Sequence, residues 1–285
     1  MTNLSVVTYL YEDPNPCKVL FDQYNVGHVN AWARMMLDTG FPDGVDLVLV
    51  TDYPEVLLRQ HGLLEQVRVL QDPAPQHIKD LGRCYRRLAI WDPELWPAQA
   101  FNSRILMIDL DVVVMKSLMP LVDKFKEKPV VFWEDQASKT GQFKYNGSML
   151  LMDWGAEPFV YQAFAASPEA NIKACQHRAL IGSDQAWYGY LFTDTPVITY
   201  EDDGVASYKF NVVREGALSK HVRIVFFHGK PKPWDLLQEP TWIDIHYKSV
   251  PSALQVAGGS MQLLQKKLAS LADTDEEDPQ LDFLD

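Results

Sequence analysis

Short runs of apolar residues recur along the chain and alternate with segments of mixed apolar and polar character. Runs that are apolar at every position are typical of strands buried on both faces of a parallel sheet. The expected strands are residues 4–11, 45–50, 67–70, 105–108, 129–133, 148–153, 197–200 and 222–227. The expected helices are residues 26–38, 55–61, 84–91 and 253–271. Strands that alternate with helices in this way predict an α/β fold with a mostly parallel, Rossmann-like central sheet and helices on both faces.

Length and composition predict the domain organisation and argue against duplex nucleic acid as a partner. The chain has 285 residues, 47% of them hydrophobic, and shows neither an internal repeat nor a clear linker. One domain is therefore expected over residues 1–250, followed by a C-terminal helix and acidic tail over residues 251–285. The formal net charge of −12 argues against duplex nucleic acid as a docking partner, because phosphate neutralisation needs clustered lysines and arginines. A local basic pocket for a small phosphorylated ligand is compatible with this charge.

Three cysteines, Cys17, Cys84 and Cys175, lie far apart in the sequence and form no CxxC pair. This spacing indicates reduced thiols rather than a disulfide framework or a structural zinc site. The N-terminal segment lacks the basic stretch of a signal peptide, and no apolar run reaches the roughly 18–20 residues that span a bilayer. A cytoplasmic protein without a transmembrane segment is expected.

Two carboxylates stand at the end of the apolar run 105–108, where a buried strand is expected to finish. Asp109 and Asp111 flank Leu110, and ligands of open parallel sheets bind beyond the carboxyl ends of the strands. Two converging carboxylates suit a hard divalent cation such as Mg²⁺ or Mn²⁺, which keeps waters and takes further ligands from substrate phosphates. Alternatively, Asp109 caps a turn and Asp111 is only exposed. The motif alone fits both interpretations.

The same motif also fits a phosphohydrolase of the haloacid dehalogenase type. A DxDxV pattern ends at Val113, and Asp202 with Asp203 could supply the later acidic pair. In that scheme Asp109 is the nucleophile and Asp111 the acid or base. Two features argue against it. The motif lies far from the start of the chain, and the scheme leaves the next motif without a role.

The segment V-F-F-H-G-K-P-K-P-W, residues 225–234, is the second candidate element. A β-branched and aromatic strand delivers His228, and Gly229 allows a close backbone approach to a ligand. A neutral imidazole can complete a divalent-metal site, and an ammonium from Lys230 or Lys232 can pair with a phosphate. The prolines stiffen the loop that carries both lysines. The alternative is that His228 only caps the strand and that the lysines are solvated.

The two elements together resemble those of the metal-dependent GT-A glycosyltransferases. Glycogenin-like and bacterial galactosyltransferase members of glycosyltransferase family 8 carry a DxD motif and a later H-x-x-G-x-x-K-P-W. The positions that match this spacing are Gly229, Lys232, Pro233 and Trp234. The family's histidine falls on Phe226, but the compact F-H-G-K-P-K-P form is similar to that of bacterial and phage glycosyltransferase-like proteins, in which His228 would be the candidate metal ligand. The resemblance covers residues 4–235 and implies a GT-A fold.

The resemblance also implies a donor, a cofactor and a set of site residues. The donor would be a nucleoside diphosphate sugar, a UDP-sugar in the family, and the cofactor Mn²⁺ or Mg²⁺ bound by Asp109, Asp111 and His228. The residues implied in donor binding are Thr8, Tyr9, Tyr11, Arg87, Asp109, Leu110, Asp111, Asp135, Gly229, Lys230 and Lys232. Those implied in positioning the sugar and stabilising the leaving group are Asn146, Asp184, Gln185 and Lys232.

Simpler structural roles exist for several of these residues. Arg87 can be a charge on a helix surface, and residues 145–148 can form a plain turn. Ser183 or Asp184 can cap the helix expected from Gln185 to Tyr190. Tyr9 can be buried packing, and Asp52 can be a ribose ligand or only a turn former.

The sequence is compatible with three functions. Sugar transfer predicts Mn²⁺-dependent binding of a nucleoside diphosphate sugar and slow hydrolysis of that donor. The resemblance to family 8 implies retention of anomeric configuration, whereas a compact relative could invert. Phosphate ester hydrolysis predicts phosphate release that Asp109→Asn abolishes. A non-catalytic module that binds a nucleotide sugar or a carbohydrate predicts binding without turnover. For sugar transfer, the acceptor can be a glycan, lipid, protein or nucleobase.

Overall fold

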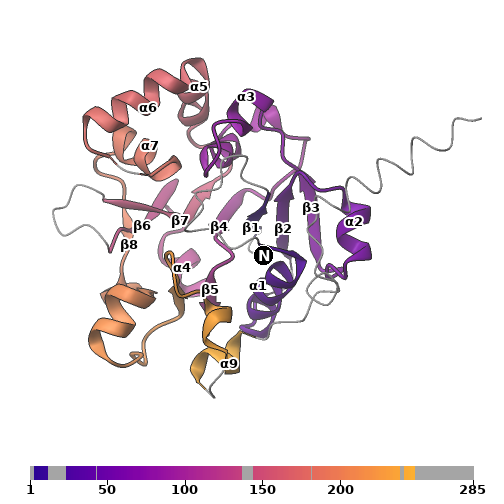
Figure 1. The fold of residues 1–285 in the computed structure, drawn as a ribbon, viewed down its shortest axis with the longest axis vertical. Coiled ribbons are helices and arrows are strands. Elements are labelled where there is room, and N and C mark those ends of the chain that lie inside the picture. Colours follow the sequence, from indigo (N-terminus) through magenta and orange to yellow (C-terminus); the bar gives the residue numbers. More distant parts are fainter. Residues whose placement is uncertain are drawn as a thin grey trace, which may run out of the picture. The chain divides into compact units, whose positions relative to one another are not determined.

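A seven-stranded sheet lies at the centre of the structure, a computed structural model that describes residues 3–11, 24–42, 44–136, 144–180, 182–237 and 241–247 (Figure 1). The strand order is β3-β2-β1-β4-β7-β6-β8. The strands are β1 Leu4–Leu10, β2 Val45–Thr51, β3 Val67–Gln71, β4 Arg104–Ile108, β6 Val130–Glu134, β7 Tyr145–Asp153 and β8 Val197–Ile198. β7 runs antiparallel to β4 and β6, and the other neighbours pair in parallel. The predicted α/β fold with a mostly parallel central sheet is confirmed.

The order of the strands reverses between β1 and β4. From β1 the chain moves outward to β2 and β3, and it then returns to place β4 on the other side of β1. Leu4 of β1 lies opposite Val45 of β2 and Arg104 of β4. The carboxyl ends of these three strands therefore meet at one edge, and a strand-order reversal at such an edge is where open α/β sheets bind ligands.

Helices and shorter helical segments cover the sheet. The α-helices are α1 Val26–Asp38, α2 Glu55–Gln60, α3 Gln76–Lys79, α4 Met119–Lys124, α5 Phe159–Ala166, α6 Pro168–His177, α7 Asp184–Leu191, α8 Tyr200–Asp203 and α9 Trp242–His246. The other segments are the 3₁₀ helices η1 Tyr85–Trp91, η2 Pro93–Leu95 and η4 Pro233–Leu236, and the π-helix η3 Tyr208–Val213. Figure 1 shows α5, α6 and α7 grouped near β6 and β7, well away from α1. Right-handed connections place α1 and α2 on one face of the sheet and η1 on the other.

The core on the η1 face consists of aliphatic strand residues and aromatic rings. It contains, among others, Val7, Val48, Met107, Phe132, Leu150, Leu88, Ile90, Trp91, Phe164 and Tyr188. All residues of η1 are buried, Arg86 and Arg87 included. Since a buried guanidinium needs a charged partner, other segments of the chain must supply carboxylates to both arginines.

A second, three-stranded sheet brings two distant motifs together. Its strands are β5 Val112–Val114, β10 Ile224–Phe226 and β9 Val205–Ser207, in that order. β10 pairs antiparallel with β5, and Phe226 lies opposite Val112. The residues just before β5 and just after β10 are therefore neighbours, which places Asp111 beside the start of the 228–234 loop.

Some predicted bounds differ from the observed ones. Residues 84–91, expected to be a helix, form the 3₁₀ helix η1. The strand expected over residues 197–200 stops at Ile198, because the Thr199 hydroxyl accepts the Asp202 N–H at 3.2 Å and starts α8. The strand expected from residue 148 begins at Tyr145, so residues 145–147 do not form the plain turn considered above.

The described residues belong to one compact unit, Met1–Val250. The helix expected over residues 253–271, the acidic tail and Cys17 lie outside the described residues, so the boundary at residue 250 stays a prediction. Cys84 and Cys175 are free thiols, and burial raises the pKa of each to about 11. Within the described ranges, the helices are too short or too polar to cross a bilayer.

Candidate active site

The DxD segment connects the two sheets at the strand-order reversal. Asp109 follows β4, and its N–H donates to the Ser148 carbonyl of β7 at 3.0 Å. Asp111 precedes β5, and its carbonyl accepts the Phe227 N–H at 2.9 Å. Leu110 between them is buried in the core. Backbone bonds on both sides therefore fix where the two carboxylates lie, at the edge predicted from the sequence.

Arg87 joins Asp109 to Asp184. Its Nη1 donates to Asp109 Oδ1, its Nε donates to Asp184 Oδ2 at 2.9 Å, and its Nη2 lies 2.6 Å from the same oxygen. The side chains of Arg87 and Asp184 are 7% and 3% exposed, whereas Asp109 is 27% exposed. Arg87 is therefore no surface charge. It connects the DxD segment to the start of α7.

The Asp109 carboxyl is the most accessible part of this bridge. Burial raises its pKa to about 6, against the effect of Arg87, and the nearby Asp111 carboxylate raises it further. A group with this pKa is mostly ionised at neutral pH and loses its charge in mildly acidic solution. The ionised form pairs with the Arg87 guanidinium, so a second cation could bind Asp109 only in competition with Arg87.

Gly147 allows β7 to pass close to the Arg87–Asp184 pair. A Cβ atom at this position would lie 3.2 Å from Asp184 Oδ1 and 3.3 Å from Arg87 Nη2. The pairing of β6 with β7 is irregular here, since Phe132 faces Leu150 while Trp133 faces Asn146. Such an irregularity bends a strand and redirects its side chains. The sequence Asn146-Gly147 reads as a turn, but it is a distorted part of β7.

The sugar-positioning candidates lie around this distortion. Asn146 Nδ2 donates to Asp135 Oδ1 at 3.2 Å, and the Ser148 N–H donates to Asn146 Oδ1 at 2.9 Å. Gln185 Oε1 accepts the Gly147 N–H at 3.4 Å. The structure therefore brings together the predicted Asn146, Asp135 and Gln185 along β6, β7 and α7. Asp184 begins α7, and its Oδ1 accepts the Gln185 N–H at 2.9 Å.

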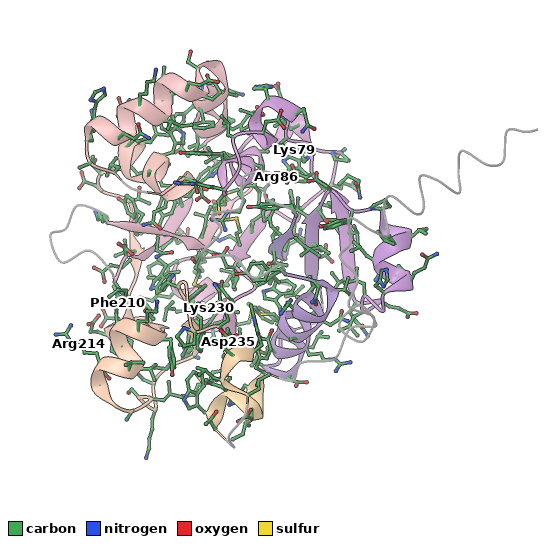
Figure 2. The ribbon with its side chains drawn as sticks, in the orientation of Figure 1. Lys79, Arg86, Phe210, Arg214, Lys230 and Asp235 are labelled. Carbon is green, nitrogen blue, oxygen red and sulfur yellow. The ribbon has the colours of Figure 1, made fainter. Side chains whose placement is uncertain are left out.

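The two lysines of the 228–234 loop point in different directions. Lys232 is 3% exposed, and its Nζ lies 2.5 Å from Asp111 Oδ2. The side chain of Lys230 is 49% exposed, and its Nζ lies 3.5 Å from Asp235 Oδ2 (Figure 2). The Lys232 N–H donates to the same Asp235 carboxylate at 2.8 Å, which fixes the start of η4. Lys232 therefore contacts the DxD segment, whereas Lys230 lies on the outer side of the loop.

His228 lies between the DxD segment and an aromatic wall. Its ring stacks on Trp133, with centroids 5.2 Å apart and an angle of 17° between the rings. Burial lowers the pKa of His228, and the nearby Asp111 and Asp135 act in the opposite direction. The imidazole is therefore largely neutral at pH 7, which is the form that binds metal ions.

At the end of β1, Thr8 is buried, Tyr9 and Tyr11 are partly exposed, and two of the three hydroxyls have no hydrogen-bond partner in the described part of the chain. Thr8 Oγ1 and Tyr9 Oη form no hydrogen bond within the described part of the chain. Tyr11 Oη donates to the Arg83 carbonyl at 3.1 Å. Buried polar groups are usually hydrogen-bonded, so these two hydroxyls are the ones at the end of β1 that a ligand could still satisfy. Gly229 has a φ of 65°, a backbone conformation that suits glycine.

Arg86 was missed in the sequence analysis, although it forms a second ionic bridge. Its Nε donates to Asp72 Oδ2 at 2.6 Å, its Nη2 pairs with Asp52, and its guanidinium lies 4.3 Å from the centroid of the Tyr11 ring. Lys79 pairs with Asp52 at 2.7 Å, and Figure 2 shows Lys79 and Arg86 near each other. Asp52 is thus an ion-pair partner. The signal was the Arg-Arg pair in an otherwise apolar segment.

Tyr24 was also missed. Its hydroxyl accepts a hydrogen bond from Lys232 Nζ at 3.3 Å, and its ring lies edge-on to Trp234 with centroids 5.6 Å apart. Burial, then the nearby Asp111 carboxylate, raise the pKa of Tyr24. Tyr24 immediately precedes the cap of α1, and nothing in its surrounding sequence distinguishes it from a packing residue.

The fit of a divalent cation rests on the chemistry of the donor atoms. No three His, Cys, Asp or Glu side chains in the described ranges are arranged as a ready metal site. Asp109 and Asp111 are instead paired with Arg87 and Lys232. Two carboxylates with a neutral imidazole from His228 alongside are nevertheless donors that Mn²⁺ and Mg²⁺ accept. The donor types fit, provided that the carboxylates exchange a protein cation for the metal.

The phosphohydrolase alternative gains no support from the site. Asp203 lies in α8, where its Oδ2 accepts the Thr199 N–H at 2.9 Å and its Oδ1 pairs with Lys124 of α4 at 2.5 Å. Its side chain is 2% exposed, so the predicted second acidic group is engaged in holding α8 and α4 together.

The comparisons with known proteins identify the fold. No protein-family model matches the sequence, and no curated protein matches it. Among solved structures, a galactosyltransferase, LgtC, in complex with donor and acceptor sugar analogues is similar with a TM-score of 0.58 at 13% identity, over 88% of this chain and 99% of that one. The glycosyltransferase GlyE from Streptococcus pneumoniae TIGR4 is similar with a TM-score of 0.51 at 14% identity, over 85% of this chain and 59% of that one. With these likenesses and the strand order described above, the chain has the GT-A fold predicted from its two motifs.

Proposed function

We propose that this protein is a glycosyltransferase that transfers a sugar from a nucleoside diphosphate sugar, a UDP-sugar, to an acceptor. The observation that carries the proposal is the convergence of Asp109, Asp111, Asp184, Arg87 and Lys232 at the strand-order reversal of a GT-A fold. Carboxylates and cations that alternate in one place suit a ligand with a diphosphate, a sugar and an accompanying cation.

In the proposal, Asp109, Asp111 and His228 hold Mn²⁺ or Mg²⁺. Once bound, the cation supplies Lewis-acid neutralisation of the charge that develops on the leaving diphosphate. Lys232 is buried, so its ammonium acts on that charge through a medium of low dielectric constant, where electrostatic stabilisation is strong. Lys230 is half exposed and contributes less.

The sugar and the nucleoside would occupy opposite sides of the DxD segment. Asp184 and Asn146, with Asp135 behind Asn146, would position the sugar hydroxyls, and the amide of Gln185 would lie near the anomeric carbon. Thr8, Tyr9 and Tyr11 at the end of β1 would contact the nucleoside, for which the unpaired hydroxyls of Thr8 and Tyr9 provide hydrogen bonds. Retention of anomeric configuration and a cytoplasmic location are part of the proposal. The acceptor can be a glycan, lipid, protein or nucleobase.

Thermal unfolding with a panel of nucleotide sugars, each with and without Mn²⁺, tests the proposal. One donor, with Mn²⁺, should raise the melting temperature by several degrees, because a ligand that binds only the folded state stabilises it by mass action. Asp111→Asn should abolish the shift, and Asp123→Asn, an exposed position in α4, should keep it. No metal-dependent shift with any donor would contradict the proposal.

Turnover separates a transferase from a binding module. A transferase that lacks its acceptor should slowly hydrolyse the donor identified by the thermal shift, and the hydrolysis should require Mn²⁺. Binding that persists without any release of sugar over hours would favour the non-catalytic module instead.

A further inference from the structure

Lys232 forms a buried contact with Asp111, and its other acceptors carry no formal charge. The side chains of Lys232 and Asp111 are 4% and 13% exposed. Besides Asp111, Nζ donates to the Tyr24 hydroxyl at 3.3 Å and to the Phe227 carbonyl at 3.3 Å. Within the described contacts, Asp111 is therefore the anionic partner of this ammonium, and a buried ammonium without one is strongly disfavoured.

The same carboxylate is a metal ligand in the proposed function. A divalent cation on Asp111 would stand next to the ammonium, and two like charges at contact distance repel strongly in a buried site. Cation binding must therefore weaken the Lys232–Asp111 pair or displace the ammonium. The geometry sets up a competition between the protein's own cation and the metal for one carboxylate.

Arg87 is in a different position. It contacts Asp109 and also holds Asp184 by contacts of 2.9 and 2.6 Å. If Asp109 turns toward a metal, the Arg87 guanidinium still has a buried anionic partner. Lys232 would keep only neutral oxygen acceptors. Separating Lys232 from Asp111 should therefore require more free energy than separating Arg87 from Asp109.

We propose that Lys232 couples the binding of the cation to the binding of the diphosphate. Without a diphosphate, the ammonium opposes the metal at Asp111. When a diphosphate is present, its oxygens offer the ammonium a new anionic partner, and Asp111 is free for the metal. Metal and diphosphate then strengthen each other's binding by the same factor, as linkage requires. This inference rests on the proposed function, and it adds that one lysine sets the interdependence of the two ligands.

Calorimetric titration with Mn²⁺, in the absence and presence of UDP, tests this coupling. In the wild-type protein, UDP should tighten Mn²⁺ binding about tenfold or more. In Lys232→Met, Mn²⁺ alone should bind about fivefold or more tighter than in the wild type, because its competitor is gone. The tightening by UDP should be about fivefold or more smaller than in the wild type, and what remains is due to direct contact between the metal and the diphosphate. Lys232→Gln, which keeps a donor for Tyr24 and Phe227, gives the same comparison if the methionine variant does not fold.

Lys230→Met is the matched control, since it removes the same charge from the same loop on the exposed side. Both its Mn²⁺ affinity and its coupling should stay within about twofold of the wild type. If Mn²⁺ binds with UDP but Lys232→Met and Lys232→Gln bind Mn²⁺ no tighter and keep the full coupling, the inference is wrong and the proposed function stands. If the wild type does not bind Mn²⁺ even with UDP, both are wrong.

Discussion

Arg86 and Arg87 are adjacent in η1, and each guanidinium joins two aspartates from distant parts of the chain. The two bridges have similar burial. Arg86 holds Asp72, whose side chain is 1% exposed, and Asp52, at 36%. Arg87 holds Asp184, at 3%, and Asp109, at 27%. Each arginine thus has one deeply buried carboxylate and one that reaches the surface.

The bridges differ in their place in the sheet. Asp52 and Asp72 follow β2 and β3, on the outer side of the sheet, and Asp72 Oδ1 also accepts the Ala74 N–H at 2.9 Å in a local turn. Asp109 follows β4, at the strand-order reversal, with Asp111 next to it. A buried ion pair is therefore no evidence of function by itself. Its position relative to the topology of the sheet gives the Arg87 bridge its proposed role.

Replacing Arg87 should have the largest effect. Arg87→Met leaves Asp109 and Asp184 without their shared cation and removes the link between the DxD segment and α7. Donor hydrolysis with Mn²⁺ should fall by about 100-fold or more in kcat/KM, as expected when a preorganised charged group is lost from a site. Steady-state hydrolysis of the donor measures the effect, and less than a tenfold loss would remove Arg87 from the proposed site.

Arg86→Met should affect stability rather than the site. It leaves Asp72 buried without its arginine, so the free energy of unfolding measured in urea should fall by about 3 kcal/mol. Donor affinity should stay within about threefold of the wild type. Lys79→Met is the control, because its pair with the partly exposed Asp52 should contribute less than about 1 kcal/mol. If Arg86→Met lost as much donor binding as Arg87→Met, the two bridges would not differ in function as proposed.

Gly147→Ala should perturb the Arg87 bridge and leave the Arg86 bridge intact. The added methyl group would press on Asp184 and Arg87, at 3.2 and 3.3 Å, and should cost about 1–2 kcal/mol of stability. Donor affinity measured by calorimetry should weaken about fivefold, because the residues that the methyl group displaces are proposed to belong to the donor site. In contrast, Gly189→Ala in α7 meets Leu180 at 3.5 Å, an ordinary contact, and should be neutral or slightly stabilising.

The last expected effect, about twofold over the first pH unit below neutral, is a dependence of donor affinity on pH that arises from Asp109. Its pKa of about 6 lies above the usual value of 3.8, so its carboxylate is increasingly protonated as the pH falls through 6. Mn²⁺-dependent donor affinity should drop about twofold from pH 7 to pH 6, and about tenfold by pH 5, because the metal needs the ionised form. The same shift makes the folded state bind the proton more tightly than the unfolded state. This group's contribution to stability therefore decreases as the pH rises from about 4 to 6.

A nucleoside diphosphate sugar is a suitable probe for this titration, since its diphosphate does not titrate in this range. Burial lowers the pKa of His228, so the imidazole should not produce a step above its usual pKa of 6.5. A constant affinity from pH 7 to pH 5 would show that Asp109 does not hold the metal as proposed.

The hydrophobic pattern predicted the strands that form the centre of the sheet. β1, β2 and β4 are mostly apolar because a parallel sheet is covered on both faces. It missed β5 and β9, whose three residues each are too short for a periodic signal. It also placed the start of β7 too late, because Asn146-Gly147 has turn composition. The glycine at that point is explained by the close approach of Asp184 and Arg87, which involves residues far away in the sequence.

In the site, the sequence indicated which residue types matter but not how they are oriented. The DxD carboxylates and the 228–234 loop were predicted to lie together, and β10 pairs with β5 to bring them there. Lys230 and Lys232 look equivalent in the sequence, yet one is exposed and the other buried. Arg86 was overlooked because its partners, Asp52 and Asp72, follow separate strands and converge only through the parallel register of the sheet.

The backbone bonds of the DxD segment have a mechanical consequence. Asp109 is fastened to β7 in the large sheet, and Asp111 is fastened to the residue after β10 in the small one. Shear between the two sheets would change the spacing of the two carboxylates. A ligand that binds both carboxylates at once therefore also restrains the motion of one sheet relative to the other. The stiffness of the contact between the two sheets then contributes to the affinity for the ligand.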